Sequence, residues 1–468
     1  MKHPLDLPAP RLAARIRDGS VSAEAVVTES LRRARAIQPT LNPFVLLREE
    51  QALAAARAAD RRRDGRPLLG VPFAAKDLTP TKGDLTTLGS WTQGNHVATE
   101  TALCIRRLEE AGAILIGKTT TPEFAFSSFT RSPRWGITRN PWDPSRTSGG
   151  SSGGSGAAVA AGVVPFAEGT DMGGSVRIPA ACCGVVGLKP SFGRIPMTIL
   201  PSMFDSLSHF GPLARSVEDS AAFMAVAAGA SDEDIQSVPL PFSLSRTRRG
   251  SLAGRRFALS VDLGYYAVQP DVEKAVRRAA GLLREAGAQV DEIDLGWTRA
   301  VNDRWFDLWC VFMSAYFGDR VPEFRDRMDP LVVGMIEKAG KMGATEIKRV
   351  EFQRTAMWRD LAGVFERYDA LLCPTCAQEA PAADQSDYDH DATTPDGRYA
   401  GFDMTLPFNM VPHCPVISLP AGFSAAGLPV GLQLVGKRYA DEDLLAMARR
   451  LEALLKPLLS AETPPMSH

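Results

Sequence analysis

Two turns rich in glycine and serine carry the residues of this sequence that are best suited to chemistry. The first reads SGGSSGGS at positions 148–155, and the second reads GTDMGGSVRIP at positions 169–179. Glycine lets backbone amides approach a reacting atom closely, and a serine hydroxyl can act as a nucleophile. Such a run is also typical of a flexible linker. The second turn argues against a linker, because Asp171, Arg177 and Pro179 surround a single serine between an apolar run and a helical one.

A serine hydroxyl is an effective nucleophile only when a base removes its proton. The sequence has six histidines, at positions 3, 96, 209, 390, 413 and 468, and none lies in a recognisable catalytic setting. A lysine can replace histidine as the base if it is neutral, and burial favours the neutral form. Lys76 follows the apolar run VPFAA at positions 71–75, which supplies such a setting. Residues 149–153 also fit the G-x-S-x-G elbow of α/β-hydrolases, but that alternative leaves Lys76 and Ser175 unexplained.

These segments resemble the amidase signature family, whose pattern reads GGSSGGS and then GTDxGGSxRxP, with an upstream lysine as in GVPFAAKD at positions 70–77. The resemblance extends from about residue 10 to residue 455. It implies that Ser175 attacks a carbonyl carbon, that Ser151 relays the proton, and that neutral Lys76 accepts it. It also implies a cis peptide bond before Ser151. The implied oxyanion hole consists of the backbone N–H groups of Met172, Gly173, Gly174 and Ser175.

Other residues of the two turns are expected to support this Ser-cisSer-Lys triad. We expect Asp171 and Arg177 to brace the second turn by hydrogen bonds, Ser152 to brace the first, and Thr170 to form part of the turn. Aromatic residues are the candidates for the substrate pocket, and they favour an apolar or aryl substrate: Phe124, Phe126, Trp135, Trp305 and Trp309. At helical spacing, an aromatic cluster such as that of residues 305–317 is equally typical of a hydrophobic core.

Helical and apolar strand-like segments alternate along the chain, which predicts an α/β fold. Buried strands are expected at residues 68–75 and 113–117, a helix at 156–162, and another at 174–183 that begins at the nucleophile. The resemblance implies a single large domain over residues 1–468, with a mixed central β-sheet covered by helices on both faces. Within it we expect a helical N-terminal segment (1–66), a catalytic core (67–215) and a variable part that shapes the substrate channel (229–400).

The composition favours a soluble cytoplasmic enzyme without cofactors. The 53 basic and 54 acidic residues give a net charge of −1, which does not suggest nucleic acid or an anionic membrane as the main partner. No run approaches the roughly 18–20 apolar residues of a membrane span. Seven scattered cysteines indicate reduced thiols. Cys373 and Cys376 have the spacing of half a zinc site, but no matching pair exists, so no metal is expected. A homodimer is a further expectation.

The implied activity is hydrolysis of a small-molecule carboxamide through a serine acyl-enzyme. One alternative is an amidotransferase A-like protein, which releases ammonia from glutamine within a partnered complex. That relative holds the α-amino group of glutamine with an acid five residues before the proline of a P-x-N segment. Here this position is Phe402, before the PFN segment at 407–409, and Asp403 is one place off. A non-catalytic binding protein is a third hypothesis, and the intact triad argues against it.

Overall fold

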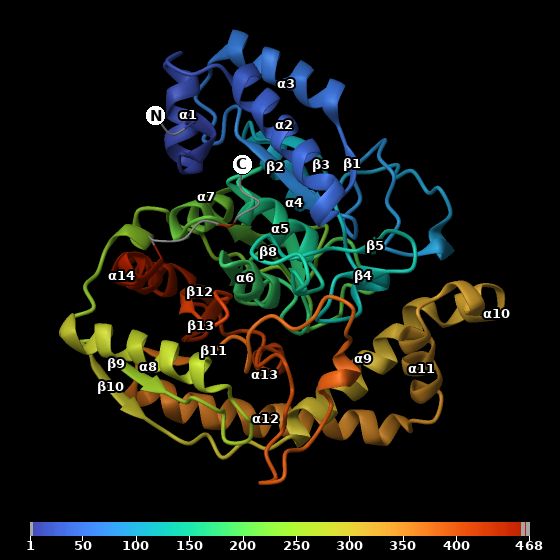
Figure 1. The fold of residues 1–468 in the computed structure, drawn as a ribbon, viewed down its shortest axis with the longest axis vertical. Coiled ribbons are helices and arrows are strands. Elements are labelled where there is room, and N and C mark those ends of the chain that lie inside the picture. The colour runs from blue at the N-terminus through green and yellow to red at the C-terminus, as the bar shows by residue number, and fades with distance from the viewer. Residues whose placement is uncertain (1–2, 460–463, 465–468) are drawn as a thin grey trace.

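An 11-stranded mixed β-sheet forms the centre of the computed structural model, which describes residues 3–459 and 464 (Figure 1). The strand order is β1-β3-β2-β6-β8-β7-β12-β13-β11-β9-β10, and helices flank the sheet, as predicted. The strands are β1 Phe44–Leu47, β2 Pro72–Lys76, β3 Ile114–Thr119, β6 Phe166–Asp171, β7 Val186–Lys189, β8 His209–Ala214, β9 Arg256–Leu259, β10 Gln289–Glu292, β11 Ala370–Pro374, β12 Val416–Phe423 and β13 Pro429–Gly436. A separate two-stranded ribbon pairs β4 Arg131–Ser132 with β5 Gly136–Ile137.

Fourteen α-helices lie within the described range. They are α1 Ala9–Arg17, α2 Ala23–Leu41, α3 Glu49–Arg62, α4 Leu103–Glu110, α5 Gly153–Ala160, α6 Arg177–Cys183, α7 Val217–Ala227, α8 Pro270–Glu285, α9 Ala300–Phe317, α10 Val321–Phe324, α11 Pro330–Ala339, α12 Ala344–Arg367, α13 Pro407–Met410 and α14 Asp441–Leu459. In Figure 1, α1–α3 lie together at the top, whereas α9–α11 lie together at the lower right. None of these helices has both the length and the apolar character needed to span a bilayer.

Three neighbouring strands bring the two serine turns and Lys76 to one edge of the sheet. Strand β2 runs parallel to both β3 and β6, so the carboxyl ends of these strands meet at the same edge. Lys76 ends β2, and Asp171 ends β6. Strand β8, which the sequence analysis did not predict, pairs antiparallel with β6 over its whole length. This pairing fixes the second turn at the end of β6.

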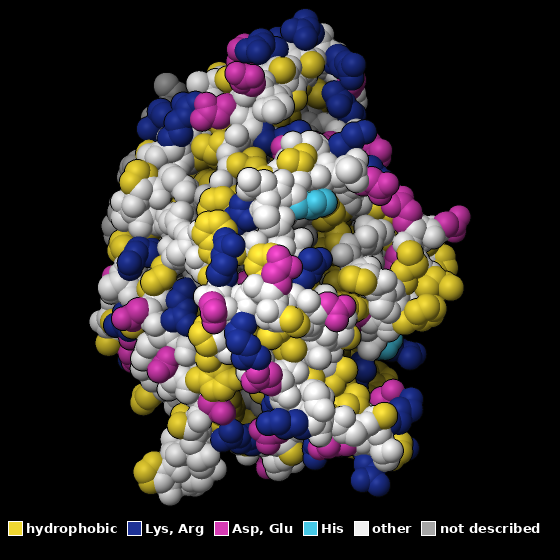
Figure 2. All heavy atoms as spheres, turned by 90° about the vertical axis from the view of Figure 1, so that its right-hand side faces the viewer, with side chains coloured by type: hydrophobic (Ala, Val, Ile, Leu, Met, Phe, Trp, Pro, Cys, Tyr) yellow, Lys and Arg dark blue, Asp and Glu magenta, His cyan; other side chains and the backbone are white. Residues whose placement is uncertain are grey.

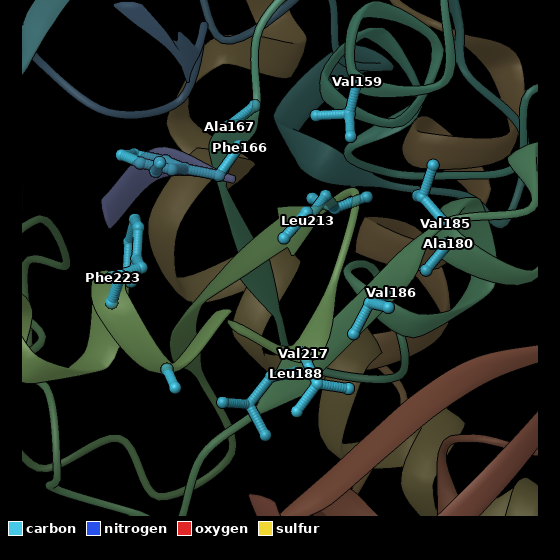
Figure 3. Close-up of a cluster of buried hydrophobic side chains, with 14 of the residues drawn as sticks. Val159, Phe166, Ala167, Ala180, Val185, Val186, Leu188, Leu213, Val217 and Phe223 are labelled. Atoms are coloured by element: carbon cyan, nitrogen blue, oxygen red, sulfur yellow. The ribbon is translucent and has the colours of Figure 1, made fainter. Parts of the chain in front are cut away.

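The core beside the site consists of apolar side chains from β6–β8 and from the helices that cover them (Figure 3). The ring of Phe166 is stacked on Phe73, with centroids 6.1 Å apart, and meets the edge of Phe223 at 5.7 Å. Full burial of each such side chain contributes about 1.5–3 kcal/mol. The strand that carries Asp171 is therefore anchored by packing on β2 and α7.

Helix ends follow local capping chemistry. The Ser22 hydroxyl accepts from the Ala25 N–H and begins α2 as predicted, and the Ser216 hydroxyl begins α7 by accepting from the Asp219 N–H. One predicted start is wrong. Helix α6 begins at Arg177 and not at residue 174, because Gly174 has a φ of 127° that no helix allows. Ser175 therefore lies in the turn before the helix. Helix α5 starts at Gly153, earlier than predicted, directly behind the first serine turn.

The surface carries both signs of charge without a large patch of either. On the face in Figure 2, Lys and Arg side chains are interspersed with Asp and Glu side chains. This distribution agrees with a net charge of −1 over the whole sequence.

Candidate active site

The side chain of Lys76 is fully buried at the end of β2. Its Nζ lies 2.7 Å from the Ser151 Oγ and 2.9 Å from the Thr170 Oγ1, and it donates to both hydroxyls. Burial lowers the pKa of Lys76 to about 7, and the negative charges of Glu168 and Asp171 oppose this effect. A lysine with such a pKa is substantially neutral near pH 7, so it can accept a proton there.

The first serine turn is joined to the second by hydrogen bonds. The peptide bond between Gly150 and Ser151 is cis. The Ser152 N–H donates to the Ser175 carbonyl oxygen at 3.1 Å, and the Ser152 hydroxyl lies 3.4 Å from the Thr170 carbonyl oxygen. The Gly150 backbone lies so close to residues 127–129 that an added Cβ would come within 2.4 Å of the Ser127 carbonyl oxygen. Only glycine fits at this position before Ser151.

Asp171 and Arg177 form a fully buried ion pair behind the second turn, with Nη2 and Oδ1 2.9 Å apart. The Asp171 carboxylate also accepts from the Gly174 N–H at 2.9 Å and from the Val176 N–H at 3.2 Å. Burial alone would raise the pKa of Asp171, but the Arg177 guanidinium and the Asn409 amide lower it well below its usual range. The carboxylate is therefore ionised, and its bonds hold the backbone around Ser175.

This geometry corrects one residue of the predicted oxyanion hole. The Gly174 N–H points to Asp171 and is not available to a substrate oxygen. The other three predicted donors, Met172, Gly173 and Ser175, all line the cavity described below, and Gly174 does not. Three backbone N–H groups thus lie at the wall that a substrate carbonyl would contact.

A cavity of about 530 Å³ opens in front of Ser151 and Ser175, and its walls are mainly apolar. Four of the predicted pocket residues line it, namely Phe124, Phe126, Trp305 and Trp309. Trp305 also serves the core: it is buried, its Nε1 donates to the Met172 carbonyl oxygen at 3.1 Å, and its ring lies against Gly173. An added Cβ on Gly173 would lie 2.3 Å from that ring.

Trp135 does not line the cavity, which contradicts its prediction as a pocket residue. Its indole Nε1 donates to the Thr87 hydroxyl at 2.8 Å, and its carbonyl oxygen accepts from the Asn42 side chain at 2.6 Å. These bonds attach the loop of residues 133–136 to the N-terminal part of the chain. Trp135 is therefore a structural anchor.

One stretch of the cavity wall is acidic. Asp403 faces the cavity and accepts from the Ser128 hydroxyl at 3.1 Å, while Asp387 accepts from the Ser128 N–H at 3.1 Å. Burial, followed by the negative charge of Asp387, raises the pKa of Asp403 to about 6. The neighbouring Phe402 is buried and packs against Phe129. The carboxylate that is displaced by one position in the sequence thus still reaches the cavity.

The sequence analysis missed three buried charged residues behind Lys76. Glu168, Asp77 and Lys118 are fully buried on β6, after β2 and on β3. Each interrupts or directly follows an otherwise apolar buried strand, as in FAEGTD and ILIGKT. A charged side chain at such a position is unusual unless it has partners. This pattern was the available signal.

In the part of the chain that the structure describes, no group of three or more His, Cys, Asp or Glu residues is arranged to hold a metal ion. Cys373 and Cys376 are both buried free thiols.

The buried pair yields a stability prediction. We expect Arg177→Met to reduce the free energy of unfolding by about 3–5 kcal/mol, because it leaves the Asp171 carboxylate buried without its cation. Arg277→Met is the control, since Arg277 forms exposed ion pairs with Glu273 and Glu292 that are worth at most about 1 kcal/mol. Urea unfolding measures both variants. Equal small losses would contradict a structural dependence on the buried pair.

The comparisons with known proteins agree with this architecture. The model of the Amidase family matches residues 25–445. An acylamidase from Rhodococcus erythropolis is 34% identical over 455 residues, which cover 96% of this chain and 95% of that protein. The A component of the glutamyl-tRNA(Gln) amidotransferase from Roseiflexus sp. (strain RS-1) is 37% identical over 462 residues, which cover 91% and 92% of the two chains.

Solved structures extend the likeness to the whole fold. The crystal structure of a bacterial aryl acylamidase of the amidase signature family superposes with a TM-score of 0.90 at 28% identity, over 98% of both chains. A 6-aminohexanoate cyclic dimer hydrolase in complex with its substrate superposes with a TM-score of 0.87 at 29% identity, over 99% of this chain and 100% of that one. The chain belongs to the amidase signature family and is an amide-hydrolysing enzyme.

Proposed function

We propose that this enzyme cleaves the C–N bond of small-molecule carboxamides with Ser175 as nucleophile, Ser151 as proton relay and neutral Lys76 as base. The observation that carries this proposal is the 2.7 Å hydrogen bond between the fully buried Lys76 Nζ and the Ser151 Oγ, beside a cavity that Ser151 and Ser175 both line. A buried amine at a serine has no structural purpose that a neutral residue could not serve at lower cost.

In the acylation step, the Ser175 Oγ forms a bond to the carbonyl carbon while its proton passes to Ser151 and the Ser151 proton passes to Lys76. The developing oxyanion accepts hydrogen bonds from the N–H groups of Met172, Gly173 and Ser175. Collapse of the tetrahedral intermediate breaks the C–N bond, and the Lys76 ammonium returns a proton through Ser151 to the leaving nitrogen.

In the deacylation step, water attacks the ester on Ser175. Its proton passes along the same relay to Lys76, and the Ser175 oxygen recovers a proton as the carboxylic acid leaves. Thr170 supports both steps, because its hydroxyl is the second hydrogen-bond acceptor of the Lys76 amine and keeps it oriented when Ser151 exchanges its proton.

We further propose that the substrate carries an apolar or aryl group. Support comes from the aromatic walls of the cavity, where Phe126 lies 5.1 Å from Trp309 between ring centroids, and from the acylamidase and aryl acylamidase relatives. The second candidate is ammonia release from glutamine in a partnered complex. Two observations favour it: the 37% identity to the amidotransferase relative, and the carboxylate of Asp403 at the cavity wall.

The nucleophile can be identified directly. We expect Ser175→Ala to lower amide turnover by more than about 10⁴-fold while its circular dichroism spectrum remains that of the wild type. A fluorophosphonate probe should label the wild-type enzyme on the peptide that contains Ser175, and the Ser175→Ala variant should take up no label. Labelling at Ser151 would reverse the assignment and support the G-x-S-x-G elbow.

The identity of the base predicts a pH profile. A lowered lysine pKa means that the neutral, active form is populated above that pKa, so kcat/KM for an amide should rise through an apparent pKa near 7 and then reach a plateau. Lys76→Ala should reduce amide hydrolysis far more than ester hydrolysis, because an alkoxide leaves without a proton from the ammonium and an amine does not.

The control for this experiment is Lys348→Ala, which changes an exposed lysine on α12. It should leave both profiles unchanged. If Lys76→Ala kept the amide rate and the acidic limb of the wild type, lysine would not be the base. The buried His209, whose Nδ1 lies 3.2 Å from the Asp171 carbonyl oxygen, would then be the next residue to test.

A substrate panel separates the two candidate functions. We expect an anilide of an apolar acid to show a higher kcat/KM than glutamine. Trp309→Ala should lower the anilide value by about 10-fold, a typical loss for an apolar pocket contact, and should affect acetamide little. Trp135→Ala is the matched control, because this tryptophan lies outside the cavity. A clear preference for glutamine would favour the amidotransferase alternative.

A further inference from the structure

Glu168 lies directly behind Lys76, on the neighbouring strand β6. Its Oε2 accepts from the backbone N–H of Lys76 at 2.8 Å, and its Oε1 accepts from the Thr79 hydroxyl at 2.9 Å. The side chain is completely buried. Among the described residues, no side-chain nitrogen of a lysine, arginine or histidine lies within 4.0 Å of this carboxylate. A buried carboxylate without a direct ion pair is costly, which indicates that its charge has a use.

The sheet geometry explains how Glu168 reaches Lys76. The register between β2 and β6 ends at Ala74 and Ala167. Beyond this point, the Glu168 carboxylate takes the Lys76 N–H in place of a strand carbonyl. Residues two apart on a strand share a face, so Glu168 and Thr170 lie on the same side of β6. One contacts the backbone of Lys76, and the other contacts its amine.

Several other charged or titratable groups face this region. On β3, the Lys118 Nζ donates to the Thr79 carbonyl oxygen at 2.6 Å. Those from the other adjoining elements are Asp77, bonded to Thr87; Asp84, paired with Arg48; the buried Cys104 thiol on α4; and Asp171, paired with Arg177. Burial, and then the charge of Glu168, raises the pKa of the Cys104 thiol, so that thiol is neutral. Asp171 is compensated by Arg177. Glu168 is thus the negative group near Lys76 without its own cation.

We propose that Glu168 is a positioning residue that holds the backbone of Lys76 and, through its negative charge, sets the pH above which the enzyme is active. The proposal rests on the function proposed above, in which neutral Lys76 is the base. Burial lowers the pKa of Lys76, and Glu168 is the strongest opposing influence. Without that opposition the amine would be neutral at lower pH but a weaker base, because basicity falls with pKa.

The charge and the hydrogen bonds of Glu168 can be tested separately with Glu168→Gln. A glutamine amide can accept from the Lys76 N–H and donate to the Thr79 oxygen, so the scaffold remains while the charge is lost. An opposite charge at close range shifts a pKa by roughly one to three units. We therefore expect the acidic limb of kcat/KM for a neutral amide to move down by about one pH unit. The position of the limb, not the height of the plateau, is the readout.

Glu452→Gln is the matched control. Glu452 is a largely buried glutamate on α14 that accepts from the Val217 backbone N–H at 2.9 Å, and burial raises its pKa to about 7. Its replacement removes the same charge from a similar environment away from Lys76, so the limb should not move. Glu168→Asp retains the charge on a shorter side chain, and its limb should stay near that of the wild type.

Each outcome decides between the proposals. A lower plateau with an unmoved limb in Glu168→Gln would assign Glu168 a structural role only and overturn the inference. If this variant does not fold, Thr79→Val carries the test: loss of one hydrogen bond to the carboxylate weakens its negative form, and a smaller downward shift is expected. A wild-type profile without a limb that depends on Lys76 would instead refute the proposed function itself.

Discussion

Burial of the Lys76 amine is the physical constraint on which the rest of this site depends. An ammonium removed from water is costly, and its pKa falls until the neutral form is populated near pH 7. The neighbouring groups then have two tasks. The hydroxyls of Ser151 and Thr170 receive the amine in a fixed orientation, and buried carboxylates limit how far the pKa falls. The same burial that makes the lysine a base also excludes bulk water from the proton relay.

The two serine turns function as one unit because they are bonded to each other and to a common frame. Ser152 links the first turn to the backbone of Ser175, and Asp171 holds the second turn by accepting from Gly174 and Val176. Arg177 extends this frame to Thr405, Asn409 and Gln433. The backbone N–H groups at the cavity are therefore rigidly placed, which is the condition for effective oxyanion stabilisation.

Local sequence patterns predicted the residues at the centre of the site but not those that depend on distant contacts. The turns and the strand before Lys76 are short motifs, and their positions in the fold agree with the mixed sheet that the resemblance implied. Strand β8 was missed because its glycine and proline are atypical of strand interiors. Trp135 and Trp309 look alike in sequence, and only the bond from Trp135 to Thr87 separates an anchor from a cavity wall. Glu168 has the same explanation, because its partners come from another strand and a loop.

The partners of the Arg177 guanidinium have a consequence for how the protein is made. Thr405, Asn409 and Gln433 follow Arg177 by 228, 232 and 256 residues in the chain. Contacts of such long sequence separation form late and slow folding. On the ribosome, a nascent chain has both serine turns and Lys76 long before the segment that completes their frame is synthesised. The enzyme therefore cannot act on cellular amides until translation is nearly finished, and its activity reports on a full-length, folded product.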